Sequence, residues 1–384
     1  MPFDFDTLPD RRSTESAKWR VYDEDVLPMW VADMDFKSPE AVIQAIQDRV
    51  AHGVFGYPKP QEALKESVVA WLDRRHGWSV DPEHLIFVPG VVTGFNLAAH
   101  TAAQPGDGVL VQTPTYGPFL KVADNVKLIQ QENELIRGED GQYAIDLDAF
   151  EAAINEKTRI FMLCNPQNPT GRVFRKDELE AMAEICLRHN VIICSDEIHG
   201  DLVFSESKHI PIALLDPEIA ANTITLLAPS KTFNIAGLKA SIAVIENDEL
   251  RQQYEIAKQG LVGWVNLLGQ VATQASYEKG AAWLDALLEY LQSNRDYVHD
   301  FVEEQLPGIS MANPEGTYLA WLDCKGMDIE DKPCDFFMEN ARVAMNDGDW
   351  FGAGGEGHIR FNFGAPRSLV KEALEKMKEA IATL

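Results

Sequence analysis

The stretch TITLLAPSKTFNIAGLK (residues 223–239) leads from an apolar run to a single lysine, Lys231. Its first part, TITLLA, is typical of a buried β-strand. A lysine just beyond such a strand is costly to bury unless its amine is neutral or hydrogen-bonded. A buried amine with a lowered pKa is also the group that forms an imine with an aldehyde. If Lys231 stood alone, a surface lysine in a loop would be the commoner interpretation.

Further apolar runs flank this one and alternate with amphipathic stretches, the pattern of a mostly parallel sheet covered by helices. We expect strands at 84–88, 108–112, 159–163, 191–194, 223–228 and 240–245. The stretch 177–190 predicts a crossover helix in which Asp177 and Glu180 form a capping pair. In open α/β sheets, ligands bind beyond the carboxyl ends of the strands. The residues that follow these runs are therefore the candidate site.

Three of these strand ends lead into turns with binding potential. HLIFV runs into PGVVTGFNLAAH, where the backbone N–H groups of Val91 and Val92 at a helix start can hold a phosphate. GVLVQ is followed by TPTYGPF, where the Tyr116 ring can stack on a flat ligand. NPQNPTG (165–171) presents the amide of Asn168 from a rigid, extended loop. Each feature by itself is more often structural than functional.

In the run VIICSDEIHGDL, Asp196 lies at the end of the apolar strand, and His199 follows three residues later. A zinc site is a poor interpretation, because DEIH lacks the second histidine of H-E-x-x-H. We predict no metal site. For His199, a hydrogen-bonded histidine near a strand end is the usual alternative.

The rest of the chain predicts a second, smaller unit. Outside the first sheet we expect helices at 61–78, 266–305 and 368–384, and strands at 316–324 and 358–363. Ser368 is a plausible cap for the last helix. These elements predict a large α/β domain at 48–283 and a smaller α+β domain at 284–384, joined by residues 1–47.

Composition excludes several classes of partner. The 384 residues include 60 acidic and 34 basic side chains, for a formal charge of −26. Such a charge repels nucleic-acid phosphates and anionic membranes, so neither is an expected partner. The five cysteines have no CxxC spacing, and there is no run of about 18 apolar residues. The N-terminal residues lack the order of a secretory leader, so we expect a cytoplasmic protein.

In this order, the segments resemble the fold-type I pyridoxal-phosphate enzymes, the aspartate aminotransferase superfamily, over nearly the full chain. The resemblance implies that fold and pyridoxal 5′-phosphate as cofactor. In the family, the lysine of S-K-T carries the cofactor as a Schiff base, which implies this role for Lys231 beside Ser230. The aspartate of S-D-E pairs with the pyridinium nitrogen, implying Asp196. The asparagine of N-P-x-N-P-T-G binds the ring hydroxyl oxygen, implying Asn168.

Two positions depart from the usual aminotransferase pattern. His199 stands where many aminotransferases have a tyrosine, and its imidazole can still face the ring oxygen. Lys239 stands where many have a phosphate-binding arginine, and it supplies charge without a two-pronged fork.

Two further segments concern the substrate and the subunit interface. HIRFNFGAPRS resembles the segment whose arginine clamps the substrate α-carboxylate, which implies Arg360. A guanidinium suits that planar contact. VFGYPKP (54–60) resembles the segment whose tyrosine reaches the cofactor phosphate of the neighbouring subunit. That implies Tyr57 as a site residue and a homodimer.

Within the superfamily, PMWVADMDF (28–36), FGYP, SDEIHGDL and SKTFNIAGL resemble the MalY/PatB-type cystathionine β-lyases, also called C–S lyases. Trp30, Ala32 and Asp33 lie where related enzymes close the N-terminal segment over substrate, although interdomain packing explains Trp30 equally well. The implied reaction is β-elimination on L-cystathionine or another cysteine S-conjugate. Lys231 removes the α-proton, a thiolate such as homocysteine leaves, and pyruvate and ammonia follow.

Two other functions stay open. An aminotransferase acting on aromatic or aliphatic amino acids uses the same residues. A cofactor-binding regulator with little turnover is the third interpretation, because a fold alone does not prove catalysis. The presence of Lys231, Asp196, Asn168 and Arg360 argues against it, since a binding module needs no base.

Overall fold

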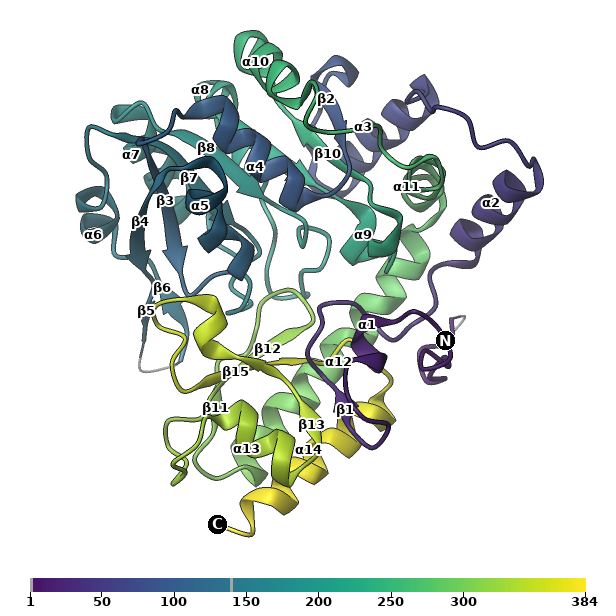
Figure 1. Ribbon diagram of the computed structural model, residues 1–384, viewed down its shortest axis with the longest axis vertical. Helices are drawn as coiled ribbons and strands as arrows, with labels where there is room; N and C mark the ends of the chain where they lie inside the picture. The colour runs from purple at the N-terminus through teal and green to yellow at the C-terminus, as the bar shows by residue number, and fades with distance from the viewer. Residues whose placement is uncertain (1–2, 139–140) are drawn as a thin grey trace.

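The computed structural model describes residues 3–138 and 141–384, and its largest feature is a mostly parallel sheet (Figure 1). Within these residues the sheet has seven strands, in the order β2, β10, β9, β8, β7, β3 and β4. They are β2 (Leu85–Val88), β3 (Gly108–Thr113), β4 (Ile129–Glu134), β7 (Thr158–Cys164), β8 (Ile192–Asp196), β9 (Thr223–Leu227) and β10 (Ser241–Val244). Every predicted strand of this sheet is present, which confirms the α/β fold.

Strand direction decides where the site can form. β10 is antiparallel to both β2 and β9, and the remaining pairs are parallel. The strands β2, β9, β8, β7 and β3 therefore all end at the same edge. The edge strand β4 was not predicted, because its sequence, IQQENE, is mostly polar and its side chains are largely exposed.

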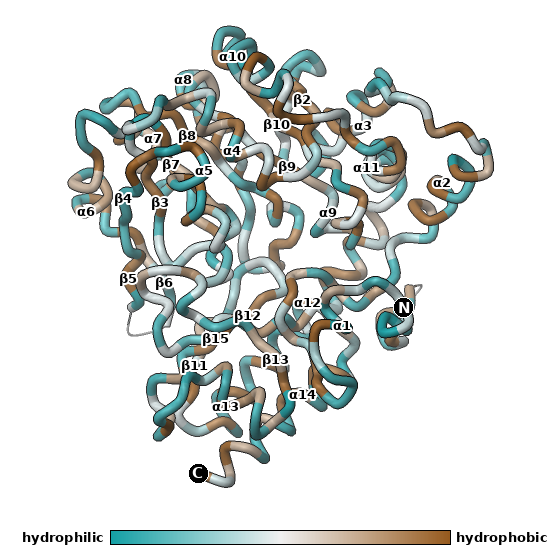
Figure 2. Tube along the Cα trace, viewed as in Figure 1, coloured by the Kyte–Doolittle hydropathy of each residue, from teal (hydrophilic) through white to brown (hydrophobic). Residues whose placement is uncertain are grey.

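Helices cover both faces of the sheet, as consecutive residues of β7 demonstrate. Ile160 and Met162 belong to one hydrophobic cluster, whereas Phe161 and Leu163 belong to another. Side chains alternate between the faces of a strand, so these clusters lie on opposite faces. The cluster with Ile160 and Met162 contains residues of α4 (Val91–Ala102), α5 (Val122–Val126) and α10 (Asp248–Lys258). The cluster with Phe161 and Leu163 contains residues of α6 (Leu147–Ala152), α7 (Lys176–Arg188) and α8 (Pro217–Ala221). In Figure 2 the hydrophobic colour gathers along the central strands.

A smaller antiparallel sheet forms the α+β part near the C-terminus (Figure 1). Its strands, in order, are β11 (Ser310–Met311), β12 (Leu319–Asp323), β15 (His358–Asn362) and β14 (Asn346–Asp347). Helices α12 (Ala281–Gln305), α13 (Pro333–Asn340) and α14 (Arg367–Ile381) accompany it. The N-terminal segment joins this part, because β1 (Leu27–Pro28) pairs with β13 (Val343–Ala344). The domain boundaries at 47/48 and 283/284 stay a prediction, and the second falls in the first turn of α12.

The other α-helices and β-strands of the described residues are α1 (Ala17–Arg20), α2 (Glu40–Ala51), α3 (Glu62–His76), α9 (Pro229–Thr232), α11 (Leu267–Lys279), β5 (Ile136–Arg137) and β6 (Tyr143–Ala144). The single helix predicted over 266–305 is wrong, because α11 and α12 are separate helices that meet at Gly280. A Cβ at Gly280 would lie 2.4 Å from the Phe233 ring, so this position requires glycine. Among the described residues, no helix is both long and apolar enough to cross a membrane.

Two predicted helix caps are also wrong. α7 begins after Arg175, whose N–H donates to the Glu178 carboxylate at 2.8 Å, so Asp177 and Glu180 do not form the capping pair. α14 begins at Arg367 after Pro366, which leaves Ser368 inside the first turn. A shift of one or two residues at a helix start is enough to change which side chain can reach the free N–H groups.

Candidate active site

A pocket of about 370 Å³ lies at the common carboxyl edge of β2, β3, β7, β8 and β9. Its volume falls in the range of small-molecule sites. Every predicted site residue except Tyr57 and Asp33 lines it: Trp30, Ala32, Val91, Val92, Tyr116, Asn168, Asp196, His199, Ser230, Lys231, Lys239 and Arg360. The small sheet and the N-terminal segment complete the pocket with Arg360 and Trp30, which lie 330 positions apart in the chain.

Lys231 sits in the short helix α9, and its amine faces the pocket. Its Nζ donates a hydrogen bond to the backbone oxygen of Ala32. Burial and, after it, the positive charge of Arg360 lower the pKa of Lys231 to about 8, although the charges of Asp33 and Asp196 oppose the shift. A much larger fraction of this amine is neutral near pH 7 than for a surface lysine, so it can act as a nucleophile or a base.

Asp196 ends β8 and is 4% exposed. Among the described residues its carboxylate accepts one hydrogen bond, from the backbone N–H of Ile198 at 3.0 Å. Burial raises the pKa of Asp196 to about 7, although the Ile198 N–H and the Lys231 charge oppose the shift. A cationic N–H donor beside this carboxylate would stabilise its ionised form.

Arg360 comes from β15 of the small sheet and is 3% exposed. Its guanidinium donates to the side-chain oxygen of Asn168 at 2.9 Å, to the backbone oxygen of Trp30 at 3.0 Å and to the side-chain oxygen of Asn346 at 2.7 Å. Burial lowers the pKa of Arg360 to about 10, so the group remains charged near pH 7. Asn346 was missed by sequence reasoning, since it lies in a stretch without a recognisable motif.

One end of the pocket is suited to a phosphate. Helix α4 starts at Val91 after Gly90, whose φ of 127° is a conformation that favours glycine. The first N–H groups of an α-helix have no partner within the helix and attract anions. Ser230 and Lys239 line the same pocket and add a hydroxyl and a positive charge.

Two further side chains form the pocket wall. His199 is 2% exposed, and burial, followed by the charges of Lys231 and Arg360, holds its pKa well below the ordinary value, so the imidazole is neutral. Burial also raises the pKa of Tyr116, which therefore stays a neutral phenol. The Tyr116 ring meets that of Trp350 edge to face at 5.6 Å. Trp350 is a second pocket residue that sequence reasoning missed.

These residues fit pyridoxal phosphate. His199 Nδ1 and Arg360 Nε are buried without hydrogen-bond partners among the described residues, as expected of a site shaped for a polar ligand. The N-terminus of α4 suits the phosphate, and Asp196 suits a protonated ring nitrogen. Lys231 supplies the amine for the aldehyde.

The structure does not bring Asp33 into the pocket. Arg11 binds its carboxylate at 2.6 Å, and the Lys18 amine lies 3.9 Å away. The contact of Asp33 with substrate stays a prediction, whereas Trp30 and Ala32 of the same segment line the pocket.

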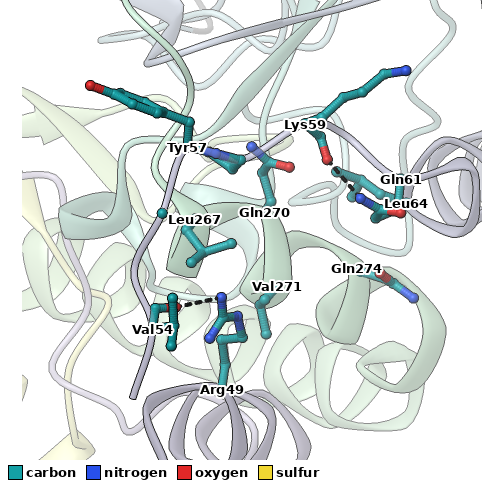
Figure 3. Close-up of a pocket in the computed structure, with 12 residues that line it drawn as sticks. Arg49, Val54, Tyr57, Lys59, Gln61, Leu64, Leu267, Gln270, Val271 and Gln274 are labelled. Carbon is teal, nitrogen blue, oxygen red and sulfur yellow. Dashed lines mark hydrogen bonds between the residues drawn. The ribbon is translucent and has the colours of Figure 1, made fainter. Parts of the chain in front are cut away.

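Tyr57 also lies elsewhere. It is 95% exposed and borders a surface pocket of about 410 Å³ between the 54–61 segment and α11. In Figure 3 its ring points away from the other labelled residues, while Arg49 binds the backbone oxygen of Val54 at 2.8 Å and fixes the segment. Within one chain, Tyr57 does not reach the pocket that holds Lys231.

Comparison with known proteins gives the same fold and family. The chain is 39% identical to cystathionine beta-lyase PatB of Bacillus subtilis, over 98% of this chain and 100% of the relative. It is 34% identical to protein MalY of Escherichia coli over 99% of both chains. The structure of cystalysin from Treponema denticola, which contains pyridoxal 5′-phosphate, superposes with a TM-score of 0.95 at 33% identity and covers 100% of both chains. The family described as aminotransferase class I and II matches residues 24–377. This chain belongs to that family of pyridoxal-phosphate-dependent, fold-type I enzymes.

Proposed function

We propose that this protein is a C–S β-lyase that cleaves L-cystathionine or a related cysteine S-conjugate to a thiol, pyruvate and ammonia. The supporting observation is that Lys231, Asp196 and Arg360 share one pocket in a chain 39% identical to a cystathionine β-lyase over nearly its full length. We also propose the roles of these residues as follows.

When bound, pyridoxal phosphate supplies an electron sink for the carbanion that forms at the substrate α-carbon. Arg360 binds the α-carboxylate of the amino acid, because its planar guanidinium can make two parallel hydrogen bonds. Lys231 Nζ takes the α-proton, for which a pKa of about 8 is suited near neutral pH. Loss of the thiolate from Cβ then completes the elimination.

The remaining pocket residues orient the cofactor and exclude water. Asp196 would hold the ring nitrogen of the cofactor in its protonated form. Asn168 and the neutral His199 would bind the ring oxygen, and Tyr116 would pack on the ring. Val91, Val92, Ser230 and Lys239 would hold the phosphate, because they line the pocket where helix α4 begins.

The test is a product assay on the holoenzyme with L-cystathionine and with S-alkyl and S-aryl cysteines. We expect thiol, pyruvate and ammonia in equal amounts without any added keto acid. Release of a product only when a keto acid is present, with no free thiol, would overturn the lyase assignment.

That outcome would instead support an aminotransferase acting on aromatic or aliphatic amino acids. The family description, aminotransferase class I and II, makes this the second candidate. Both reactions need the same base and the same carboxylate clamp, so only the products separate them.

We propose further that the active form is a homodimer in which Tyr57 reaches the pocket of the partner. Tyr57, Val54 and Phe55 are 95%, 60% and 59% exposed, an unusual cluster of large apolar side chains for a free surface. Trp264 and Leu261 add 66% and 67% exposed side chains. Light scattering should give twice the mass of one chain; a monomer with full activity would contradict the proposal.

We place the protein in the cytoplasm. All five cysteines are free, as is usual in a reducing compartment. Fractionation of cells that produce the protein should recover it with cytoplasmic markers, and recovery in a secreted fraction would contradict this location.

A further inference from the structure

The turn that follows Asp196 has two faces, and only one of them belongs to the pocket. The side chains of Asp196 and His199 line the pocket, whereas Asp201 lies outside it. Backbone hydrogen bonds close the turn: Gly200 N–H donates to Glu197 O at 2.8 Å, and Leu202 N–H donates to His199 O at 2.8 Å. The pocket face and the rear face are therefore parts of one rigid turn.

On the rear face, the Asp201 carboxylate binds three side chains from two other elements. Trp71 Nε1 and His76 Nε2, both from α3, contact Asp201 Oδ1 at 3.0 and 3.2 Å. The Thr232 hydroxyl donates to Asp201 Oδ2 at 3.0 Å. Burial alone would raise the pKa of Asp201, but the hydrogen bonds and charge of His76 and the bond from Trp71 lower it. Asp201 is thus an ionised acceptor with both oxygens occupied.

Thr232 is the residue after Lys231, and it is 1% exposed. Both lie in α9, a helix of only 4 residues. Such a short helix has little stiffness of its own, so side-chain bonds to its surroundings fix its position. The Thr232–Asp201 bond joins α9 directly to the turn that carries Asp196 and His199.

We propose that Asp201 is a positioning residue that fixes the amine of Lys231 relative to Asp196 by holding the Thr232 hydroxyl. The inference rests on the proposed role of Lys231 in the reaction. Catalytic groups must be held to within about 0.5 Å, and a misplacement of about 1 Å can lower the rate about 100-fold. Trp71 and His76 hold the carboxylate from the other side, so Asp201 is fixed before it binds Thr232.

The experiment compares four holoenzyme variants with the wild type, three of them at threonines and the fourth Asp201→Asn. Thr232→Val removes the hydroxyl at nearly constant shape, and Thr232→Ser keeps it. Thr223→Val is the matched control: Thr223 is also 1% exposed, and its hydroxyl donates to Ile219 O at 2.7 Å at the far end of β9. It removes a buried hydroxyl bond without touching α9.

The first measurement is the pH midpoint of the absorbance change of the bound cofactor, which reports protonation at its linkage to Lys231. The charges of Arg360, Asp33, Asp196 and Lys239 act on Lys231, so a displaced amine would experience a different electrostatic environment. We expect Thr232→Val to shift the midpoint by about one pH unit. Thr232→Ser and Thr223→Val should titrate as the wild type does.

The second measurement separates kcat from KM. Thr232→Val should lower kcat about tenfold or more with KM nearly unchanged, because Arg360 still binds the substrate. Asp201→Asn should give the same pattern and replaces Thr232→Val if that variant does not fold. An unchanged midpoint and kcat in both variants would overturn the positioning role, and so would equal effects in Thr223→Val.

The titration needs no turnover, so the two proposals can fail separately. A wild type that titrates at Lys231 but releases no thiol overturns the lyase assignment alone. A wild type with no cofactor linkage at Lys231 overturns both.

Discussion

The pocket around Lys231 and the segment around Tyr57 differ in how much of a site one chain builds. The pocket is enclosed by the ends of five strands and by the small sheet, and Asp196, His199 and Arg360 are each less than 5% exposed there. Tyr57 is 95% exposed and does not line that pocket. Residues of the pocket are positioned by the fold of one subunit, whereas the role proposed for Tyr57 requires a second subunit.

The largest expected effect is that of Lys231→Ala, which tests whether the pocket is the reaction site. Turnover should fall about 1000-fold or more, because the base and the point of cofactor attachment are both lost. Product release is the measurement. Borohydride reduction of the wild type followed by peptide mapping should label Lys231; a label on another lysine would remove it from this role.

Asp196→Asn should stabilise the cofactor-free protein at high pH only. Burial raises the pKa of Asp196 from 3.8 to about 7, so the folded state keeps a proton that the unfolded state releases within this window. The folded protein therefore loses stability as the pH rises from about 4 to about 7. A shift of about three units corresponds to at most about 4 kcal/mol. Urea unfolding of the wild type and of Asp196→Asn at about pH 4 and pH 8 measures this difference in the free energy of unfolding. An equal gain in stability at both pH values would contradict the raised pKa of Asp196.

Arg360→Lys should raise KM for amino acids about tenfold or more while kcat changes less, because one point charge replaces a two-pronged contact. Steady-state kinetics with several cysteine S-conjugates measure this. Asn346→Ala should have a smaller effect than Arg360→Lys, because it removes one 2.7 Å hydrogen bond to Arg360 but keeps the guanidinium. Unchanged kinetics in Arg360→Lys would exclude it as the carboxylate clamp.

Tyr57→Phe should have the smallest effect on stability, within about 0.5 kcal/mol, since the side chain is exposed in one chain. Its effect on activity should appear only in the assembled enzyme. Mixed dimers of Tyr57→Phe and Lys231→Ala subunits should regain activity, because one of their two pockets has both residues intact. Mixed dimers that form but stay inactive would place Tyr57 in its own subunit's site.

The difference between pocket and interface also explains what sequence reasoning could predict. Strand positions were predictable because buried parallel strands are continuous apolar runs. The residues at their ends follow directly, so the apolar pattern is enough to assign Lys231, Asp196, Asn168 and Tyr116 to one edge of the sheet. Helix starts were less predictable, because caps at Arg175 and Pro366 have no strong sequence signal.

Contacts between distant segments were decided by the tertiary structure alone. Arg11 binds Asp33, and Asn346 binds Arg360 without belonging to any motif. Asp201 reaches Thr232 across 31 positions and Trp71 across 130. The sequence by itself determined the apolar runs and the reactive groups that follow them, because these depend on local pattern. Which side chains then bind one another depends on the packing of α3, α9 and the two sheets, a property that no local pattern encodes.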